Sequence, residues 1–322
     1  MTGRRIIVGI DGSPGAQTAM LWAANAARLH QCGLLIVHAP DPAEAALIAT
    51  AGEPALTAFD DGARRMLSAA KHVASRRAPA VAVSGLLSQG GAAETLIDLS
   101  QNAVMLVVGS RLQAGITTSI LGSVSHRVAA HSHAPVVVVP LQPNLASATP
   151  KTHIVVGAAP SSSGRAALAF AFDEAHRRSL RLSVIRAIGR DSARIPESAV
   201  EVDEIWTKRA LRALEHDLAS LRQEFPDVQV ELRVERSDPA EALTAAAVDT
   251  EMLVIGCHHS DDRWSTRLGP VPTTILMNAD CPIVVIGQSA SSAQHDREQH
   301  SRIGFGAESA SFGWNGHQIT GM

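Results

Sequence analysis

Three short segments in the first half of the chain carry residue types that suit a phosphorylated ligand. The first covers residues 9–13, where Asp11 follows an apolar run and precedes a Gly-Ser pair. A carboxylate in this place can accept a hydrogen bond from a ribose hydroxyl or hold a Mg²⁺ ion that is bound to phosphate. The alternative is structural, because an Asp-Gly turn followed by a helix cap needs no ligand.

The other two segments supply groups that favour an anion. Gly109 ends an apolar run just before Arg111, and Gly122-Ser123 opens a helical pattern. Glycines let backbone amides approach a phosphate closely, and a helix N-terminus adds unpaired N–H groups and a positive dipole. Arg111 offers a charge-assisted contact, and Ser123 offers a hydroxyl donor. The structural alternative is that Gly109 ends a strand and Gly122-Ser123 caps a helix.

The elements around these segments predict a doubly wound, mainly parallel sheet. Continuous apolar runs indicate strands that are buried on both faces. Helical patterns lie between them: one opens with Ser13 as cap and Pro14 as first residue, one covers 53–77, and two begin near Ala92 and at Gly122-Ser123. In such a sheet, ligands bind outside the carboxyl ends of the strands, where the three segments would meet. The expected strands are 5–10, 34–39, 80–84, 104–109 and 136–140.

The chain contains this pattern twice. Residues 5–9 recur as 153–157, residues 106–109 as 253–256, and residues 134–139 as 281–286, at a spacing of 147 or 148 positions. A period of this size indicates a duplicated domain. We expect five-stranded α/β domains at 1–142 and 151–288, followed by a disordered tail at 289–322. Strands of the second repeat are expected at 153–157, 181–186, 228–234, 252–256 and 283–286.

The second repeat keeps the strands and loses the ligand-binding groups. Ala159 stands in the place of Asp11, and Gly269-Pro270 replaces Gly122-Ser123. Pro270 has no N–H, so it removes one donor from the helix N-terminus. Cys257-His258-His259 contains metal-ligand residue types, but their adjacency favours a polar loop over a metal site. The sequence therefore predicts a degenerate second domain and no metal site.

These motifs resemble the universal stress protein family. The nucleotide signature of that family is Gly, two residues, Gly, nine residues, then Gly-Ser or Gly-Thr. Gly109 and Gly122-Ser123 match its first and last elements, while Leu112 takes the place of the middle glycine and Gly115 follows three residues on. The opening at 8–13, the Val-His pair at 37–38 and the ending at 134–140 also match.

The resemblance covers both repeats and implies the tandem type of the family, with the adenine-nucleotide α-hydrolase-like fold. It implies that ATP or a related adenine nucleotide, with Mg²⁺ as a further candidate, binds Asp11, Gly109, Gly122, Ser123 and Val124. The adenine would lie near the end of the second strand, at His38-Ala39. It also implies a homodimer, or an intrachain pairing of the two domains, through their last strands.

Composition limits the other classes of function. The net charge of -3 and the pI of about 6.5 argue against a nucleic-acid partner, and no apolar run is long enough to span a membrane. Three cysteines without CxxC spacing favour reduced thiols in the cytoplasm. No P-loop or nucleophile-elbow motif is present, so we expect a non-enzymatic, ATP-binding stress or regulatory protein. The alternative is an interaction scaffold that has lost its nucleotide; an enzyme of the same broad fold is the least favoured class.

Overall fold

The structure is a computed structural model of the 322-residue chain. It describes residues 4–112, 119–120, 122–141, 151–189, 200–257 and 268–287. The tail expected at 289–322 lies outside these ranges, as do residues 142–150 between the two repeats.

Five parallel strands form the sheet of the first repeat, in the order β3-β2-β1-β4-β7. Their side chains are mostly apolar and are buried in the central strands, because helices cover both faces. The strand order reverses between β1 and β4, which is where a doubly wound sheet opens a crevice at its carboxyl edge. The strands are β1 (Arg5–Ile10), β2 (Gly33–His38), β3 (Val83–Leu87), β4 (Ala103–Gly109) and β7 (Val136–Val139).

The second repeat has the same order, β10-β9-β8-β11-β12, and its strands are also parallel to one another. The expected doubly wound α/β fold is therefore confirmed for both repeats. The strands are β8 (His153–Gly157), β9 (Arg181–Ala187), β10 (Val230–Glu235), β11 (Leu253–Gly256) and β12 (Ile283–Ile286).

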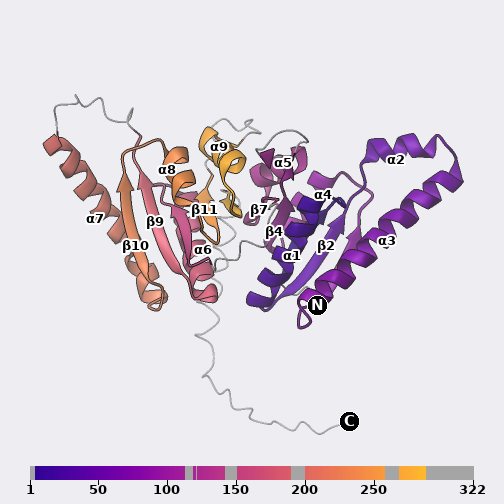
Figure 1. Ribbon diagram of the computed structural model, residues 1–322, viewed down its shortest axis with the longest axis horizontal. Helices are drawn as coiled ribbons and strands as arrows, with labels where there is room; N and C mark the ends of the chain where they lie inside the picture. The colour runs from indigo at the N-terminus through magenta and orange to yellow at the C-terminus, as the bar shows by residue number, and fades with distance from the viewer. Residues whose placement is uncertain are drawn as a thin grey trace, which may run out of the picture.

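The two repeats share one ten-stranded sheet because their last strands pair with each other. β7 and β12 are antiparallel, with Val137 opposite Val284. This is the intrachain form of the pairing that the sequence predicted. It places the two halves side by side, with β3 and β10 as the outer strands (Figure 1).

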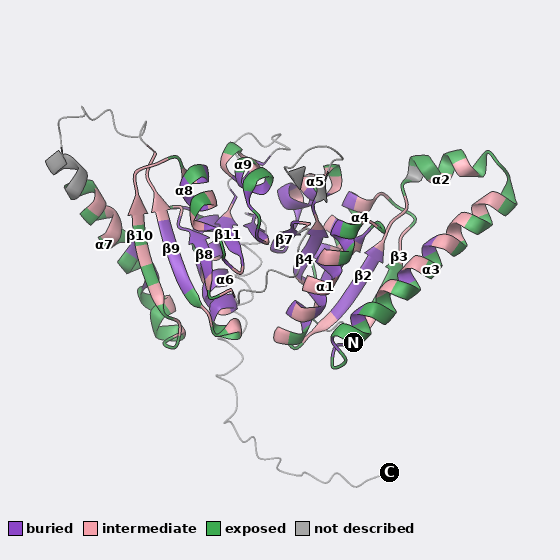
Figure 2. Ribbon diagram, in the orientation of Figure 1, coloured by how far each residue is buried: buried purple, intermediate pink, exposed green. Residues whose placement is uncertain are grey.

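Each face of the sheet is covered by helices from both repeats. One core packs beneath the long helices α1 (Pro14–Leu29), α3 (Glu53–Arg77), α6 (Ser162–Arg178) and α7 (Val200–Glu224). The other packs beneath the short helices α4 (Ala92–Ser100), α5 (Ser123–His131), α8 (Pro239–Ala246) and α9 (Pro270–Asn278). Figure 2 shows the buried strands between these exposed helix surfaces. None of the described helices is long and apolar enough to cross a membrane.

Two strands begin two or three residues later than predicted, for the same reason in both repeats. The expected strands 80–84 and 228–234 begin in the structure at Val83 and Val230. The N–H of Val81 bonds back to the carbonyl of Ala78, and that of Val228 bonds back to Phe225. These valines are thus held in the turn after the preceding helix and cannot join the strand ladder.

Two elements were not predicted at all. Helix α2 (Pro42–Ala49) packs on α3 and projects with it beyond the edge of the sheet (Figure 1). A small antiparallel hairpin joins β5 (Arg111–Leu112) to β6 (Ser119–Ile120) after the end of β4.

Candidate functional site

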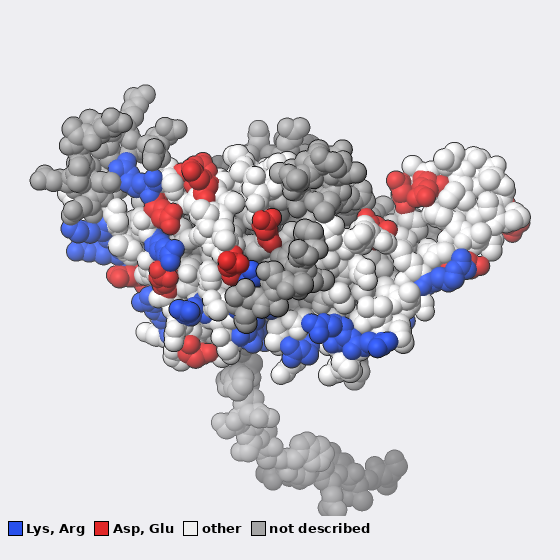
Figure 3. Space-filling model, in the orientation of Figure 1, with Lys and Arg blue, Asp and Glu red and all other residues white. Residues whose placement is uncertain are grey.

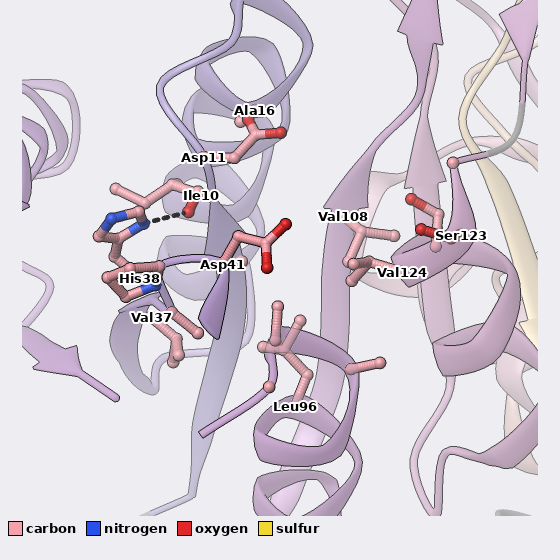
Figure 4. A pocket seen from close by; sticks show the side chains of 18 of the residues that line it. Ile10, Asp11, Ala16, Val37, His38, Asp41, Leu96, Val108, Ser123 and Val124 are labelled. Atoms are coloured by element: carbon pink, nitrogen blue, oxygen red, sulfur yellow. Dashed lines mark hydrogen bonds between the residues drawn. The ribbon is translucent and has the colours of Figure 1, made fainter. Parts of the chain in front are cut away.

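A cavity of about 840 Å³ opens at the carboxyl ends of β1, β2 and β4. This volume is typical of small-molecule sites, which measure roughly 300–1,000 Å³. Asp11 and Asp41 point into it from one side, and Ser123 and Val124 line the opposite side (Figure 4). The cavity thus brings together six of the seven predicted site residues: Asp11, Ala39, Gly109, Gly122, Ser123 and Val124.

The seventh predicted residue, Arg111, lies in β5 directly after this edge of the sheet. Its backbone pairs with Ile120, while its side chain lies outside the described part of the structure. The same holds for the side chain of Leu112, and Gly115 is outside the described residues entirely.

Asp11 forms the local turn that the structural alternative predicted, and it also lines the cavity. Its Oδ1 accepts a hydrogen bond of 3.0 Å from the N–H of Ser13. Ser13 in turn caps α1, because its Oγ accepts from the N–H of Ala16 at 3.2 Å. Gly12 between them has a φ of +81°, which favours glycine. The turn holds the carboxylate at the mouth of the cavity.

Gly109 has a packing role that the sequence did not reveal. A methyl group at this position would lie 2.5 Å from the backbone carbon of Gly15, at the start of α1. Gly256 of the second repeat is in the same situation, 2.6 Å from the backbone carbon of Ser163 in α6. The close approach of helix and strand therefore requires glycine in both repeats, whether or not a ligand binds.

Two helices begin at the cavity with a glycine as their N-cap residue. Gly122 is the N-cap of α5 and Gly91 is the N-cap of α4, and neither has a side chain to satisfy the first N–H groups. Such termini present hydrogen-bond donors and positive dipole ends, which suits an anion. The Oγ of Ser125 donates to the carbonyl of Gly109 at 3.0 Å, which ties α5 to the end of β4.

Sequence reasoning missed four charged residues among those that line the cavity: Asp41, Glu44, Glu94 and Arg127. Asp41 caps α2 by accepting from the N–H of Ala43 at 2.9 Å, and the Asp-Pro pair was a signal for that helix start. Arg127 and Glu94 line the cavity from α5 and α4 and form an ion pair. Arg127 follows Ser123 by one helical turn and therefore lies on the same face of α5. This spacing could have identified it as a cavity residue from the sequence.

The second repeat fills the corresponding position at the end of β9 with a larger side chain. His38 of β2 bonds through Nδ1 to the carbonyl of Ile10 at 2.9 Å (Figure 4). In the same register, Arg186 of β9 donates through Nε to the carbonyl of Ala158 at 3.0 Å. Its Nη2 also lies 3.5 Å from a carboxylate oxygen of Asp217 in α7. A guanidinium group thus occupies the place that the smaller imidazole takes in the first repeat.

The other features of the second repeat do not reproduce the first site. Pro270 is the first residue of α9, as its sequence position predicted. A smaller cavity of about 400 Å³ lies at the opposite, amino ends of β8, β9 and β10. Cys257 is fully buried, and burial raises the pKa of its thiol, whereas His258 and His259 fall outside the described residues.

The architecture and the cavity together define a tandem α/β protein with a cavity at the switch point of its first sheet. The model of the universal stress protein family matches residues 3–140 and 151–287. The chain is 31% identical over 296 residues to universal stress protein Rv2623 of Mycobacterium tuberculosis, covering 88% of this chain and 96% of that protein. It is 30% identical over 289 residues to a universal stress protein of Mycolicibacterium smegmatis, covering 87% and 96%.

The solved structures agree on the fold. The crystal structure of a universal stress protein from Archaeoglobus fulgidus covers 89% of this chain and 97% of its own, with a TM-score of 0.64 at 14% identity. The chain therefore belongs to the universal stress protein family and carries two domains of that family in tandem, as the sequence motifs predicted.

Proposed function

We propose that this protein is a cytoplasmic, non-enzymatic regulator of the stress response that binds ATP in its first domain. The observation that carries the proposal is the cavity itself. It joins a carboxylate from the end of β1, apolar walls, and the N-terminus of α5, whose N-cap has no side chain. These are the groups that a nucleotide needs for its ribose, its base and its phosphates, respectively.

The cavity offers a different surface for each part of the nucleotide. Val37 and Leu96 provide apolar contact for the base near Ala39, at the end of β2. Asp11 would accept from a ribose hydroxyl or hold a phosphate-bound cation. The N-terminus of α5, with the hydroxyl of Ser123, would receive a phosphate.

The charge around the cavity favours a nucleotide that arrives with Mg²⁺. Four carboxylates line it, and they would repel a bare polyphosphate. Figure 3 shows acidic side chains (red) over the α2 region, while blue side chains follow the lower edge of this half. When bound, Mg²⁺ would neutralise part of the phosphate charge between these groups. The four residues are Asp11, Asp41, Glu44 and Glu94.

Thermal unfolding tests the proposal. A ligand present at about 100 times its dissociation constant stabilises the folded state by roughly 2.7 kcal/mol. We expect excess ATP with Mg²⁺ to raise the melting midpoint by several degrees, since each kcal/mol moves it by about 2–4 °C. Absence of any shift, together with no nucleotide released from the purified protein by heat, would contradict ATP binding.

Matched variants locate the site. Asp11→Asn keeps an acceptor for Ser13 but loses the charge, and Gly122→Ala fits the φ of -64° without strain while adding a methyl group to a residue that lines the cavity. Both should remove most of the shift. Gly269→Ala adds a methyl group to the N-cap of α9, whose φ is -60°, and should leave the ATP-dependent shift of the melting midpoint intact. An equal loss with Gly269→Ala would contradict the assignment to the first domain.

A second candidate function is an interaction scaffold that no longer binds nucleotide. The departure at Leu112 favours it, because a branched side chain replaces the middle glycine of the signature. Under this alternative, neither ATP nor ADP shifts the melting midpoint, and Leu112→Gly restores a shift.

A further inference from the structure

The ion pair between Glu94 and Arg127 bridges the two helices whose N-termini open into the cavity. Arg127 Nη2 donates to Glu94 Oε1 at 2.5 Å, from the second turn of α5 to the first turn of α4. The two side chains are 53% and 54% exposed, so both are free to change partners. Both residues line the cavity in which we propose that a nucleotide binds.

Arg127 is the one lysine or arginine among the described residues that line this cavity. It lies four positions after Ser123 and therefore on the same face of α5, about one helical turn further along. A phosphate at the N-terminus of α5 would bring the next phosphates toward this guanidinium. Arginine binds phosphate through paired, charge-assisted hydrogen bonds.

Glu94 itself occupies an anion position at the N-terminus of α4. Its Oε2 lies beside Gly91, the N-cap of α4, where an added methyl group would collide with it. A hydrogen bond from its own backbone N–H, and then the guanidinium of Arg127, lower the pKa of this carboxyl group. The carboxylate therefore remains ionised and satisfies both the helix terminus and the arginine.

We infer that Arg127 distinguishes nucleotides by the number of their phosphates. In the absence of an outer phosphate, Glu94 is the anion that pairs with Arg127, and the outer phosphate displaces Glu94 from this arginine. This inference rests on the proposed nucleotide site. A nucleoside triphosphate reaches Arg127, whereas a monophosphate ends at the N-terminus of α5. Displacing Glu94 from Arg127 costs little free energy, because the carboxylate is exposed to solvent and keeps the hydrogen bond from its own backbone N–H at the start of α4.

The second repeat supplies a control for this pair. Glu241 stands 147 positions after Glu94, in the first turn of α8, but Thr274 replaces Arg127 in α9. The carboxylate is therefore present there without a guanidinium at the corresponding place. Glu241→Gln therefore removes the equivalent charge outside the first cavity. It controls for any effect on nucleotide binding that comes only from the lower net charge of the protein.

Calorimetric titrations with ATP, ADP and AMP, each with Mg²⁺, test the inference. Arg127→Ala should weaken ATP binding about tenfold, as expected for lost charge-assisted hydrogen bonds, and leave AMP binding unchanged. Glu94→Gln should tighten ATP binding about threefold, the scale of an exposed ion pair, without affecting AMP. Glu241→Gln should change neither.

The double variant Glu94→Gln with Arg127→Ala should bind ATP as weakly as Arg127→Ala alone. If the gain from Glu94→Gln persists without Arg127, the carboxylate acts only by repulsion and the inference is overturned. It is equally overturned if Arg127→Ala weakens ATP and AMP by the same factor. Failure of the wild type to bind any of the three nucleotides would instead reject the proposed function. Unchanged melting midpoints without nucleotide check that the variants fold.

Discussion

Glycine at position 109 is required by the contact between β4 and α1, and this leads to a stability prediction. Gly109→Ala would place a methyl group 2.5 Å from the backbone of Gly15, which cannot yield as a side chain can. We expect a loss of about 3 kcal/mol in the free energy of unfolding, at the upper end for overpacking. Urea denaturation without nucleotide measures it, and Gly256→Ala should cost a similar amount.

The control is Gly62→Ala in α3. Beyond the backbone of its own helix and its chain neighbours, nothing lies within 4 Å of the added methyl group, and glycine in a helix is less stable than alanine by roughly 0.5–1 kcal/mol. This variant should therefore be slightly more stable than the wild type. If Gly109→Ala unfolds at the same urea concentration as Gly62→Ala, the contact does not constrain position 109.

At the residue scale, the sequence predicted which residues lie at the cavity better than it predicted their structural roles. Asp11, Gly122 and Ser123 were identified because loops at the carboxyl ends of parallel strands converge on one edge. The packing role of Gly109 was hidden, because the distance between a strand and a helix is set by tertiary structure. Arg127 was missed because its relevance depends on where α4 places Glu94, which no local pattern encodes.

At the scale of elements, the long helices α1 and α6 begin at equivalent serine caps of unequal burial. Ser161 is buried, and its Oγ accepts from the N–H of Gly164 at 2.9 Å; the corresponding bond of Ser13 is 3.2 Å and more exposed. Ser161→Ala should lower the free energy of unfolding by about 1–2 kcal/mol, and Ser13→Ala by about 0.5–1 kcal/mol. Chemical denaturation measures both, and a larger loss at Ser13 would contradict this order.

Element boundaries were predictable where a local signal fixes them. The Ser13-Pro14 pair located the start of α1, and the predicted helix at 53–77 matches α3. The starts of β3 and β10 were placed too early. Val81 and Val228 have strand propensity, but their N–H groups donate to carbonyl groups within turns and not to a neighbouring strand. Helix α2 was missed because none of its described side chains is buried, which leaves it without a clear apolar face.

At the scale of the whole molecule, a buried polar cluster links the two domains on the face of α1 and α6. His30 Nε2, at the end of α1, lies 2.5 Å from Oε1 of the fully buried Glu174 in α6. Arg178 donates to the other oxygen of Glu174 at 2.9 Å and to Glu251 at 3.1 Å. The guanidinium of Arg178 also lies 5.5 Å from the ring centre of Trp22 in α1. Breaking a buried pair of this kind costs about 3–5 kcal/mol.

This cluster makes the stability of the tandem protein depend on acid pH. Burial raises the pKa of Glu174, but the hydrogen bonds and charges of His30 and Arg178 outweigh it, so the pKa lies below the usual 4.5. A lowered pKa adds stability that is complete above the unfolded value and is lost as pH falls through the folded value. Glu174→Gln should therefore cost about 3 kcal/mol at pH 7, and this difference from the wild type should shrink as the pH falls below the usual value of 4.5.

Urea denaturation of both proteins between pH 7 and pH 3 measures this difference. Burial is the main cause that raises the pKa of Glu251, and wild type and variant share it, whereas the smaller effect of the Glu174 charge is lost in the variant. Glu231→Gln serves as the control, because its partner Arg233 is on the exposed edge strand β10, where an ion pair contributes about 1 kcal/mol or less. A deficit for Glu174→Gln that stays constant across this range would show that packing, and not the charge of Glu174, joins α1 to α6.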